Sequence, residues 1–112
     1  MKMAKLVEVR ETVDPQNLRW GHTVVGATAV QLTALGFIFS KGLLLRAPGS
    51  DDGTPNTNFI WVGGAGVTAD SDVATGGIPI PPGDSINLPV NDPSKIYVIS
   101  DAASQEIAWM GA

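Results

Sequence analysis

The stretch from residue 59 to residue 100 constrains the fold most, because short apolar runs alternate there with dense turn sequences. The apolar runs are residues 59–62, 86–90 and 96–99, and the turn sequences between and after them are residues 63–66, 76–85 and 91–94. β-Branched and aromatic residues bounded by Gly, Pro, Asn and Asp are typical of short strands joined by tight turns. The thirteen glycines and eight prolines of the chain also argue against long helices. The sequence therefore predicts an all-β protein.

The remainder of the chain is expected to supply partner strands. In residues 3–13, Val7, Val9 and Val13 alternate with polar residues, and this pattern predicts a half-buried strand. That strand is either an ordinary edge strand or an extended arm that adds to the sheet of a neighbouring molecule. Further strands are expected at residues 22–26, 28–34, 42–47 and 105–110. The segment 28–34 is followed by an apolar stretch that continues to residue 41.

Several local details follow from turn and strand chemistry. Pro82-Gly83 fits a type II turn. The prolines around Ile80 place that segment at a sheet edge or outside the sheet, because proline cannot donate to a ladder. Residues 96–99 are apolar on both faces, which predicts a central strand. Residues 50–58 are polar and are expected to form a hairpin tip between two strands.

About eight short strands at this spacing predict a small β-sandwich or jelly roll with an extended N-terminal segment. At 112 residues, the chain fits one domain. We divide it into an N-terminal arm or edge strand, residues 1–20, and a β-sandwich body, residues 21–112. The predicted core consists of Leu44, Ile60, Val62, Ile86, Leu88, Tyr97, Ile99 and Ile107.

Composition narrows the classes of partner. The net charge of −4 disfavours nucleic acid, which needs a basic face. No run approaches the roughly 18 apolar residues that span a membrane, and the N-terminus lacks a signal-peptide pattern. Only 16% of residues are charged, against about a quarter in typical soluble domains. We expect part of the surface to be covered by a partner or by copies of the same chain.

The residues that could support chemistry are few. The chain has no cysteine and one histidine, His22, and no serine lies in a G-x-S-x-G elbow. Residues 63–66 lack the lysine and the spacing of a phosphate-binding loop. Asp51-Asp52 and the pair Asp70 and Asp72 could supply oxygen ligands, but no complete calcium loop is present. We therefore expect no enzymatic activity, no cofactor and no metal. Trp20 is either a core side chain or an interface anchor, and core is the default for a lone tryptophan.

Four segments carry a resemblance to a known kind of protein: GLLLRAP, IWVGGAGVT, GIPIPPGDSINLPVNDPSKIYVISD and the closing IAWMG. Together, over about residues 42–111, they resemble a recurrent small module of tailed-bacteriophage virion proteins. The shared features are a strand ending in V-G-G, a proline-glycine turn before an apolar strand, and an S-K-I-Y-V strand. The resemblance implies a head decoration or cement protein with a β-sandwich or jelly-roll body and no enzymatic activity. It also implies a homo-oligomer, for which we expect a dimer or trimer built partly by edge-strand pairing.

These observations lead to one functional hypothesis and two alternatives. The hypothesis is a decoration protein, made in the cytoplasm of a bacterial host, that binds the virion exterior and bridges subunits of the major capsid protein. Its attachment would use the N-terminal segment, with the capsid-binding residues Lys2, Lys5, Leu6, Val7, Val9, Arg10, Val13 and Trp20. The first alternative is a carbohydrate- or receptor-binding module of a phage head or tail fibre. The second is a small β-sandwich enzyme that acts through His22.

Overall fold

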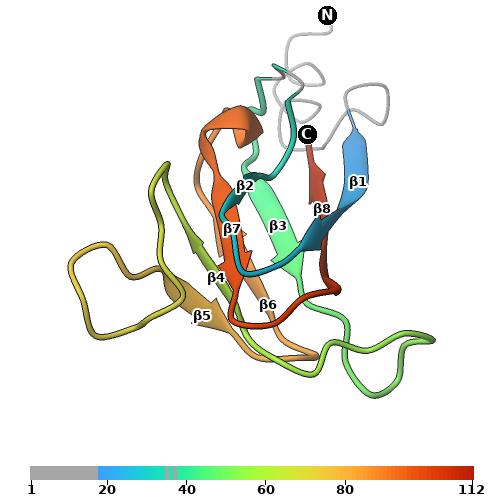
Figure 1. Cartoon of the computed structure of the whole chain (residues 1–112). Helices are drawn as coiled ribbons and strands as arrows, with labels where there is room; N and C mark the ends of the chain where they lie inside the picture. The colour runs from blue at the N-terminus through green and yellow to red at the C-terminus, as the bar shows by residue number, and fades with distance from the viewer. Residues whose placement is uncertain (1–17, 35, 37) are drawn as a thin grey trace, which may run out of the picture.

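The computed structural model describes residues 18–34, 36 and 38–112 and is nearly all-β, as predicted (Figure 1). The predicted strand at residues 3–13 lies outside the described residues. A short 3-10 turn, η2 (Pro93–Lys95), precedes β7. The eight strands of the described part are β1 (Arg19–Val25), β2 (Val30–Gln31), β3 (Leu43–Arg46), β4 (Ile60–Gly63), β5 (Ile78–Ile80), β6 (Ser85–Leu88), β7 (Tyr97–Ser100) and β8 (Gln105–Gly111).

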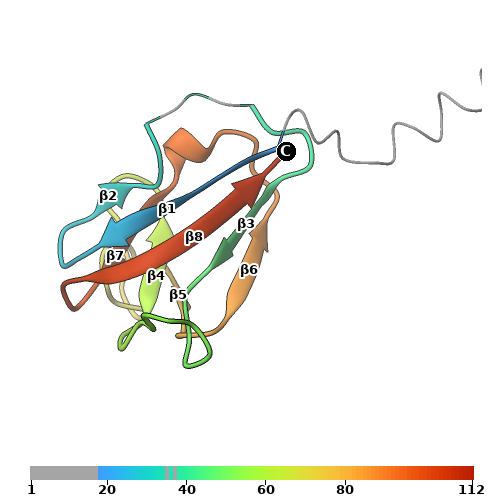
Figure 2. The same ribbon diagram turned by 90° about the vertical axis from the view of Figure 1, so that its right-hand side faces the viewer.

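The strands form two four-stranded sheets, which we name sheet A (β1-β8-β3-β6) and sheet B (β2-β7-β4-β5). Within the sheets the first strand pairs with the last, the second with the seventh, the third with the sixth and the fourth with the fifth, all antiparallel. The chain is therefore a long hairpin, with its tip between β4 and β5, that is wound into two layers. The winding brings β3 beside β8 and β4 beside β7. This strand order is that of a jelly roll, and Figure 2 shows the strands of sheet A side by side with sheet B behind them.

The core lies between the two sheets and is built from the side chains that each strand points inward. Leu45 and Ile107 from sheet A, together with Ile60, Ile80 and Val98 from sheet B, have no exposed surface. Except in β7, where Ile99 and Ser100 are also buried, these residues alternate with exposed or half-buried neighbours, which is the period of two that a strand with one buried face requires.

Most of the predicted core is confirmed, and two members, Leu44 and Tyr97, are wrong. Burial is confirmed for Ile60, Val62, Ile107 and Ile99, and Ile86 and Leu88 are half-buried against the core. Ile99 and the half-buried Tyr97 lie on the outer face of sheet B, because Val98 between them points into the core. Leu44 is not a core residue either, since 39% of it is exposed. Leu43 and Leu45 take the two inward positions of β3, which leaves Leu44 on the outer face.

The local predictions for the second half of the chain are confirmed. β5, with Pro79 at its centre, is an edge strand, and β7 lies inside sheet B. Asp84 N donates to Pro81 O at 3.0 Å, and Gly83 has a φ of +90°, as the third position of a type II turn requires. By contrast, among the described residues of the predicted strand at 28–34 and its apolar continuation, only the two-residue β2 is a strand. The later apolar residue Phe39 is buried from an irregular segment and donates its backbone N–H to Asn91 O at 2.6 Å.

The loop over residues 50–58 is not a hairpin tip, because β3 belongs to sheet A and β4 to sheet B. The loop instead crosses from one layer to the other, and the buried side chain of Asn56 anchors it. Asn56 Nδ2 donates to Glu106 O at 2.8 Å, and Glu106 N donates to Asn56 Oδ1 at 2.9 Å. If the β3–β8 register continued, Pro48 would lie opposite Glu106. The amide of Asn56 thus takes the place of a strand neighbour at the point where β3 has ended.

A second buried amide, Gln105, holds the next residues of the same loop. Its Oε1 accepts from the backbone N–H groups of Thr57 and Asn58 at 2.9 and 3.0 Å. Its Nε2 donates to Ala103 O at 3.0 Å. The two amides satisfy buried polar groups that would otherwise cost stability, and together they tie the crossover to the first residues of β8.

Candidate interaction surface

An exposed apolar row crosses the outer face of sheet A. Met110 of β8 lies between Trp20 of β1 and Leu44 of β3 in the strand register. The exposed fractions are 65% for Trp20, 44% for Met110 and 39% for Leu44, and Val24, further along β1 on the same face, is 70% exposed. These four residues, which we name the outer patch, are half of the eight large hydrophobic residues exposed in the described chain. An exposed apolar cluster of this kind is typical of an interaction site.

Polar side chains border the outer patch. His22 and Arg46 lie on either side of Ala108 in the next row of the sheet. His22 Nδ1 is 2.9 Å from Glu106 Oε1, and Arg46 Nη1 donates to Asp52 Oδ2 at 2.9 Å. Exposed ion pairs of this kind add little to stability. Three members of the outer patch, Trp20, Leu44 and Met110, line a shallow groove of about 220 Å³ together with His22 and Arg46. The groove offers both apolar contact and hydrogen-bonding groups, and Val24 lies outside it.

The outer face of sheet B differs because the chain itself covers part of it. Trp61 lies between Pro79 and Ile99 in the register and is half-buried. Its Nε1 donates to Ser71 Oγ at 3.0 Å, and its ring centroid is 5.9 Å from that of Phe59. Ser71 belongs to the excursion between β4 and β5, whereas Figure 2 shows no described segment in front of sheet A. Sheet A therefore carries the more open apolar face.

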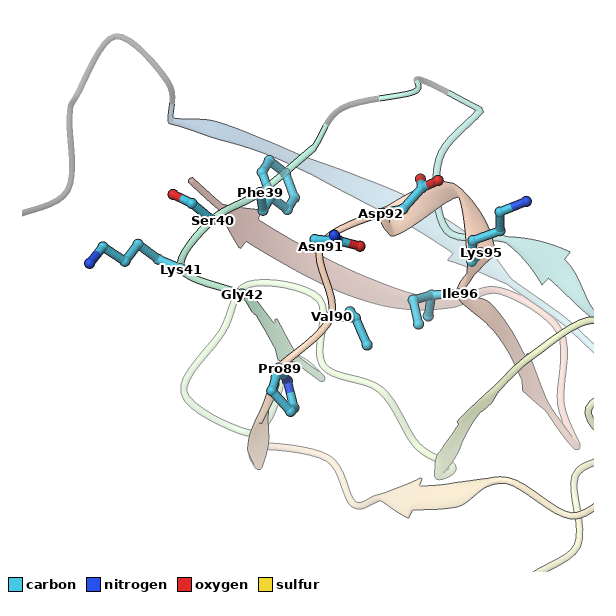
Figure 3. A pocket seen from close by; sticks show the side chains of 10 residues that line it. All are labelled: Phe39, Ser40, Lys41, Gly42, Pro89, Val90, Asn91, Asp92, Lys95 and Ile96. Atoms are coloured by element: carbon cyan, nitrogen blue, oxygen red, sulfur yellow. The ribbon is translucent and has the colours of Figure 1, made fainter.

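A larger groove, of about 570 Å³, lies at one end of the sandwich between residues 39–42 and 89–96 (Figure 3). Its walls include Phe39, Val90 and Ile96, and the side chains of Lys41 and Lys95 point away from one another at its two ends. The polar groups therefore do not converge on one point, as they would in a small-molecule site.

The carboxylate of Asp92, at the rim of this larger groove, caps the turn η2. Ser94 Oγ and Ser94 N donate to Asp92 Oδ1 at 2.6 and 3.0 Å, and these two bonds lower the pKa of Asp92. A nearby cation, Lys95, adds a smaller effect in the same direction. The carboxylate is therefore already committed to a structural role at the groove rim.

The acidic loops also use their carboxylates internally. Asp52 accepts from Gly49 N at 2.7 Å as well as from Arg46, and the two bonds lower the pKa of Asp52, the Gly49 bond most. Asp70 Oδ1 accepts from Asp72 N at 2.8 Å. Within the described ranges, no group of three or more His, Cys, Asp or Glu side chains is placed to hold a metal ion. The same residues contain no helix with the length and apolar content of a membrane span.

Of the predicted capsid-binding residues, the structure describes one, Trp20. The default expectation that this tryptophan is a core side chain is wrong, because Trp109 occupies the inward position on β8 instead. A Cβ on Gly21, the β1 residue opposite Trp109, would lie 2.8 Å from the indole, so glycine makes room for that ring. The other predicted residues lie outside the described part: Lys2, Lys5, Leu6, Val7, Val9, Arg10 and Val13.

Three members of the outer patch, Val24, Leu44 and Met110, were not among the predicted site residues. Two of them could have been found from the alternation of side chains along a strand. In β1 this alternation places Val24 on the same face as Trp20, and in β8 it places Met110 on the face opposite to that of Trp109. No comparable signal marks Leu44, because its neighbours are also leucines. Comparison of the chain with protein-family models, with curated proteins and with solved structures found no match.

Proposed function

We propose that this protein is a bacteriophage capsid decoration protein that binds the outside of the assembled head and bridges neighbouring subunits of the major capsid protein. The outer patch is the observation that carries the proposal, because it is an open apolar face on an otherwise well-packed sandwich. The resemblance of residues 42–111 to virion modules and the jelly-roll strand order support the same class. Fold alone does not imply function, so the surface carries the greater weight.

The attachment combines the outer patch with the N-terminal segment. That segment enters sheet A at Arg19, directly before Trp20. In the proposed complex Lys2, Lys5 and Arg10 meet acidic groups of the capsid. Apolar contact comes from Leu6, Val7, Val9 and Val13, and backbone pairing with a capsid strand sets the register.

Bridging does not require strong individual contacts. Each copy engages more than one capsid subunit, so weak contacts act together through their effective concentration. Binding to the assembled lattice and not to free subunits also stabilises the lattice by mass action. The first 20 residues carry four basic and three acidic groups, and the rest of the chain carries three basic and eight acidic groups. The acidic body faces solvent in this arrangement and helps to keep the particle soluble.

The test uses undecorated heads mixed with purified variants. Deletion of residues 1–13 should lower occupancy and abolish protection of the heads against heat. Met110→Glu should lower occupancy, because it places a charge in the outer patch. Val73→Glu is the matched control, since Val73 is a similarly exposed apolar residue (49%) in the excursion on the sheet B side. Full occupancy and full heat protection by the truncated protein would refute the attachment, and failure of the intact protein to bind heads would refute the function.

A carbohydrate- or receptor-binding module is the second candidate function. The observation that favours it is the exposed Trp20 ring beside His22 and Arg46 in one shallow groove, since an aromatic face with neighbouring hydrogen-bonding groups suits a small polar ligand. Tryptophan fluorescence should then change saturably with a host glycan, and Trp20→Ala should abolish the change. Absence of any response, together with binding to heads, would favour decoration.

A further inference from the structure

The two sheets have four edge strands, and these differ in how well they are protected against pairing with another chain. β2 has two residues, and β5 has three with Pro79 at its centre. β6 has four residues and is followed by Pro89. β1 has seven residues without proline, and no described strand pairs with it on the side away from β8. Short length and proline are the usual devices that block edge pairing, so β1 is the open edge of the described sandwich.

We infer that β1 is a self-association edge, at which a second copy of this chain pairs antiparallel with β1 about a two-fold axis at His22. His22 is the central residue of the seven, and Trp20 and Val24 lie two positions to either side of it on the same exposed face. An antiparallel pair centred on His22 places Trp20 of one copy opposite Val24 of the other. Both residues are mostly exposed in the single chain, at 65% and 70%. The two-fold axis therefore gives two Trp20–Val24 pairs, one on each side of it, and each pair covers both of its side chains.

The pairing also continues the apolar row across the two copies. In one copy the row runs from Leu44 through Met110 to Trp20. The second copy's Val24 then follows Trp20, and the two-fold axis generates a second row of the same composition. Cross-strand pairs of an aromatic and a β-branched residue are among the favourable ones in antiparallel sheets.

Electrostatics permits contact between copies at this edge. The chain carries a net charge of −4, so two copies repel each other in general. None of the eleven acidic residues lies in β1, whose sequence RWGHTVV contains one arginine and one histidine. A pair of strand edges with two tryptophans and two valines buries less than the roughly 1,200 Å² of a standard stable interface. We therefore expect a reversible dimer whose population rises with concentration.

The inference does not depend on the capsid role and is tested in solution with the full-length protein. The chain has no cysteine, so single cysteines can be introduced cleanly. Facing residues of an antiparallel pair have Cα atoms about 4.5–5.5 Å apart, which is within the range that a disulfide spans. His22→Cys should therefore give a covalent dimer under mild oxidation. Asn87→Cys, on the edge strand β6, is the matched control and should stay largely monomeric.

Sedimentation velocity over a concentration series supplies the second measurement. The wild-type protein should shift towards a dimer as its concentration rises. Val24→Lys should weaken association by roughly tenfold or more, because it removes the apolar valine contact and places a charged group in the interface on each side of the axis. Val24 is largely exposed, so this variant should keep the wild-type circular dichroism spectrum. Val73→Lys, which is exposed elsewhere, should associate like the wild type.

Three results would overturn the inference. One is a wild-type protein that is monomeric at every concentration. That result would refute self-association at β1 even if hydrogen exchange showed the β1 amides to be protected, because residues 1–17 of the same chain could then be their partner. Another is a dimer that Val24→Lys leaves unchanged. The third is cross-linking of His22→Cys that is no more efficient than that of Asn87→Cys, since that result would place the contact at another edge or in another register.

Discussion

The buried amide of Asn56 offers the sharpest test of how the two layers are joined. Asn56 is 7% exposed and forms two hydrogen bonds with the backbone of Glu106, at 2.8 and 2.9 Å. Asn56→Ala would leave a backbone N–H and a backbone C=O of β8 without their partner. Each unsatisfied buried group costs about 1–3 kcal/mol, so we expect the two together to cost about 2–6 kcal/mol. That is a large part of the roughly 5–15 kcal/mol that holds a domain together.

Two nearly isosteric variants separate hydrogen bonding from shape. Asn56→Asp should cost at least as much as alanine, because a carboxylate oxygen would replace Nδ2 and face the carbonyl oxygen of Glu106. Gln105→Glu should cost less than Asn56→Asp. Its carboxylate can still accept from the N–H groups of Thr57 and Asn58, and charge-assisted bonds are the stronger kind. That variant loses the two bonds that Nε2 donates, to Ala103 O and to Thr57 Oγ1.

Urea unfolding followed by circular dichroism at about pH 7 measures all three variants, and linear extrapolation gives the free energy of unfolding. Thr54→Ala, an exposed change in the same loop, is the control and should lie within about 0.5 kcal/mol of wild type. A loss below about 1 kcal/mol for Asn56→Ala would refute the reasoning. So would a larger loss for Gln105→Glu than for Asn56→Asp.

Three further predictions concern the core, a close approach and pH. Ile107 has no exposed surface in the central core, so Ile107→Ala should lower the free energy of unfolding by about 3–5 kcal/mol in thermal or urea unfolding. Ile99 lies on the outer face of sheet B, so Ile99→Ala should cost about 2 kcal/mol. Equal losses would contradict the assigned faces. Gly21→Ala should cost about 1–3 kcal/mol, because its Cβ would lie 2.8 Å from an indole ring, while Gly53→Ala, with nothing within 4 Å, should be close to neutral. The pKa of Asp52 is lowered from 3.8, so its stabilisation is present above that value and disappears as pH falls through the lowered pKa. Asp52→Asn should therefore be less stable than wild type in urea at about pH 7 but similar at about pH 2, and a difference that persists in acid would contradict this explanation.

Local chemistry in the sequence predicts much of this fold. The turn at Pro82-Gly83, the edge position of Pro79 and the central position of β7 each follow from one property, such as a missing N–H donor or apolar residues on both faces. The number of strands and the sandwich class follow from the spacing of turns. These features depend on residues close together in the chain, which is why the sequence indicates them.

Features that depend on the other layer were not predictable in the same way. Residues 43–45 are three consecutive leucines, so the sequence allows either Leu44 or the pair Leu43 and Leu45 to face the core. Packing partners across the core decide that Leu44 faces out. The crossover at residues 50–58 reads as a polar hairpin tip because its anchor, Asn56, is itself polar. The exposed position of Trp20 depends on Trp109, distant in sequence, filling the inward site beside Gly21.

The pairing of the first strand with the last has a consequence for how the protein folds. β1 gains its sheet partner only from β8, at the far end of the described chain, and β3 also borders β8. Closing a contact across so long a stretch of chain carries a large entropy cost, and folds rich in such contacts reach the native state slowly, on the order of milliseconds to seconds. On the ribosome, β1 and the β8 side of β3 therefore remain unpaired until the eighth strand has emerged. The hairpin of β4 and β5, which are the paired strands closest in sequence, closes early, and sheet A is completed last.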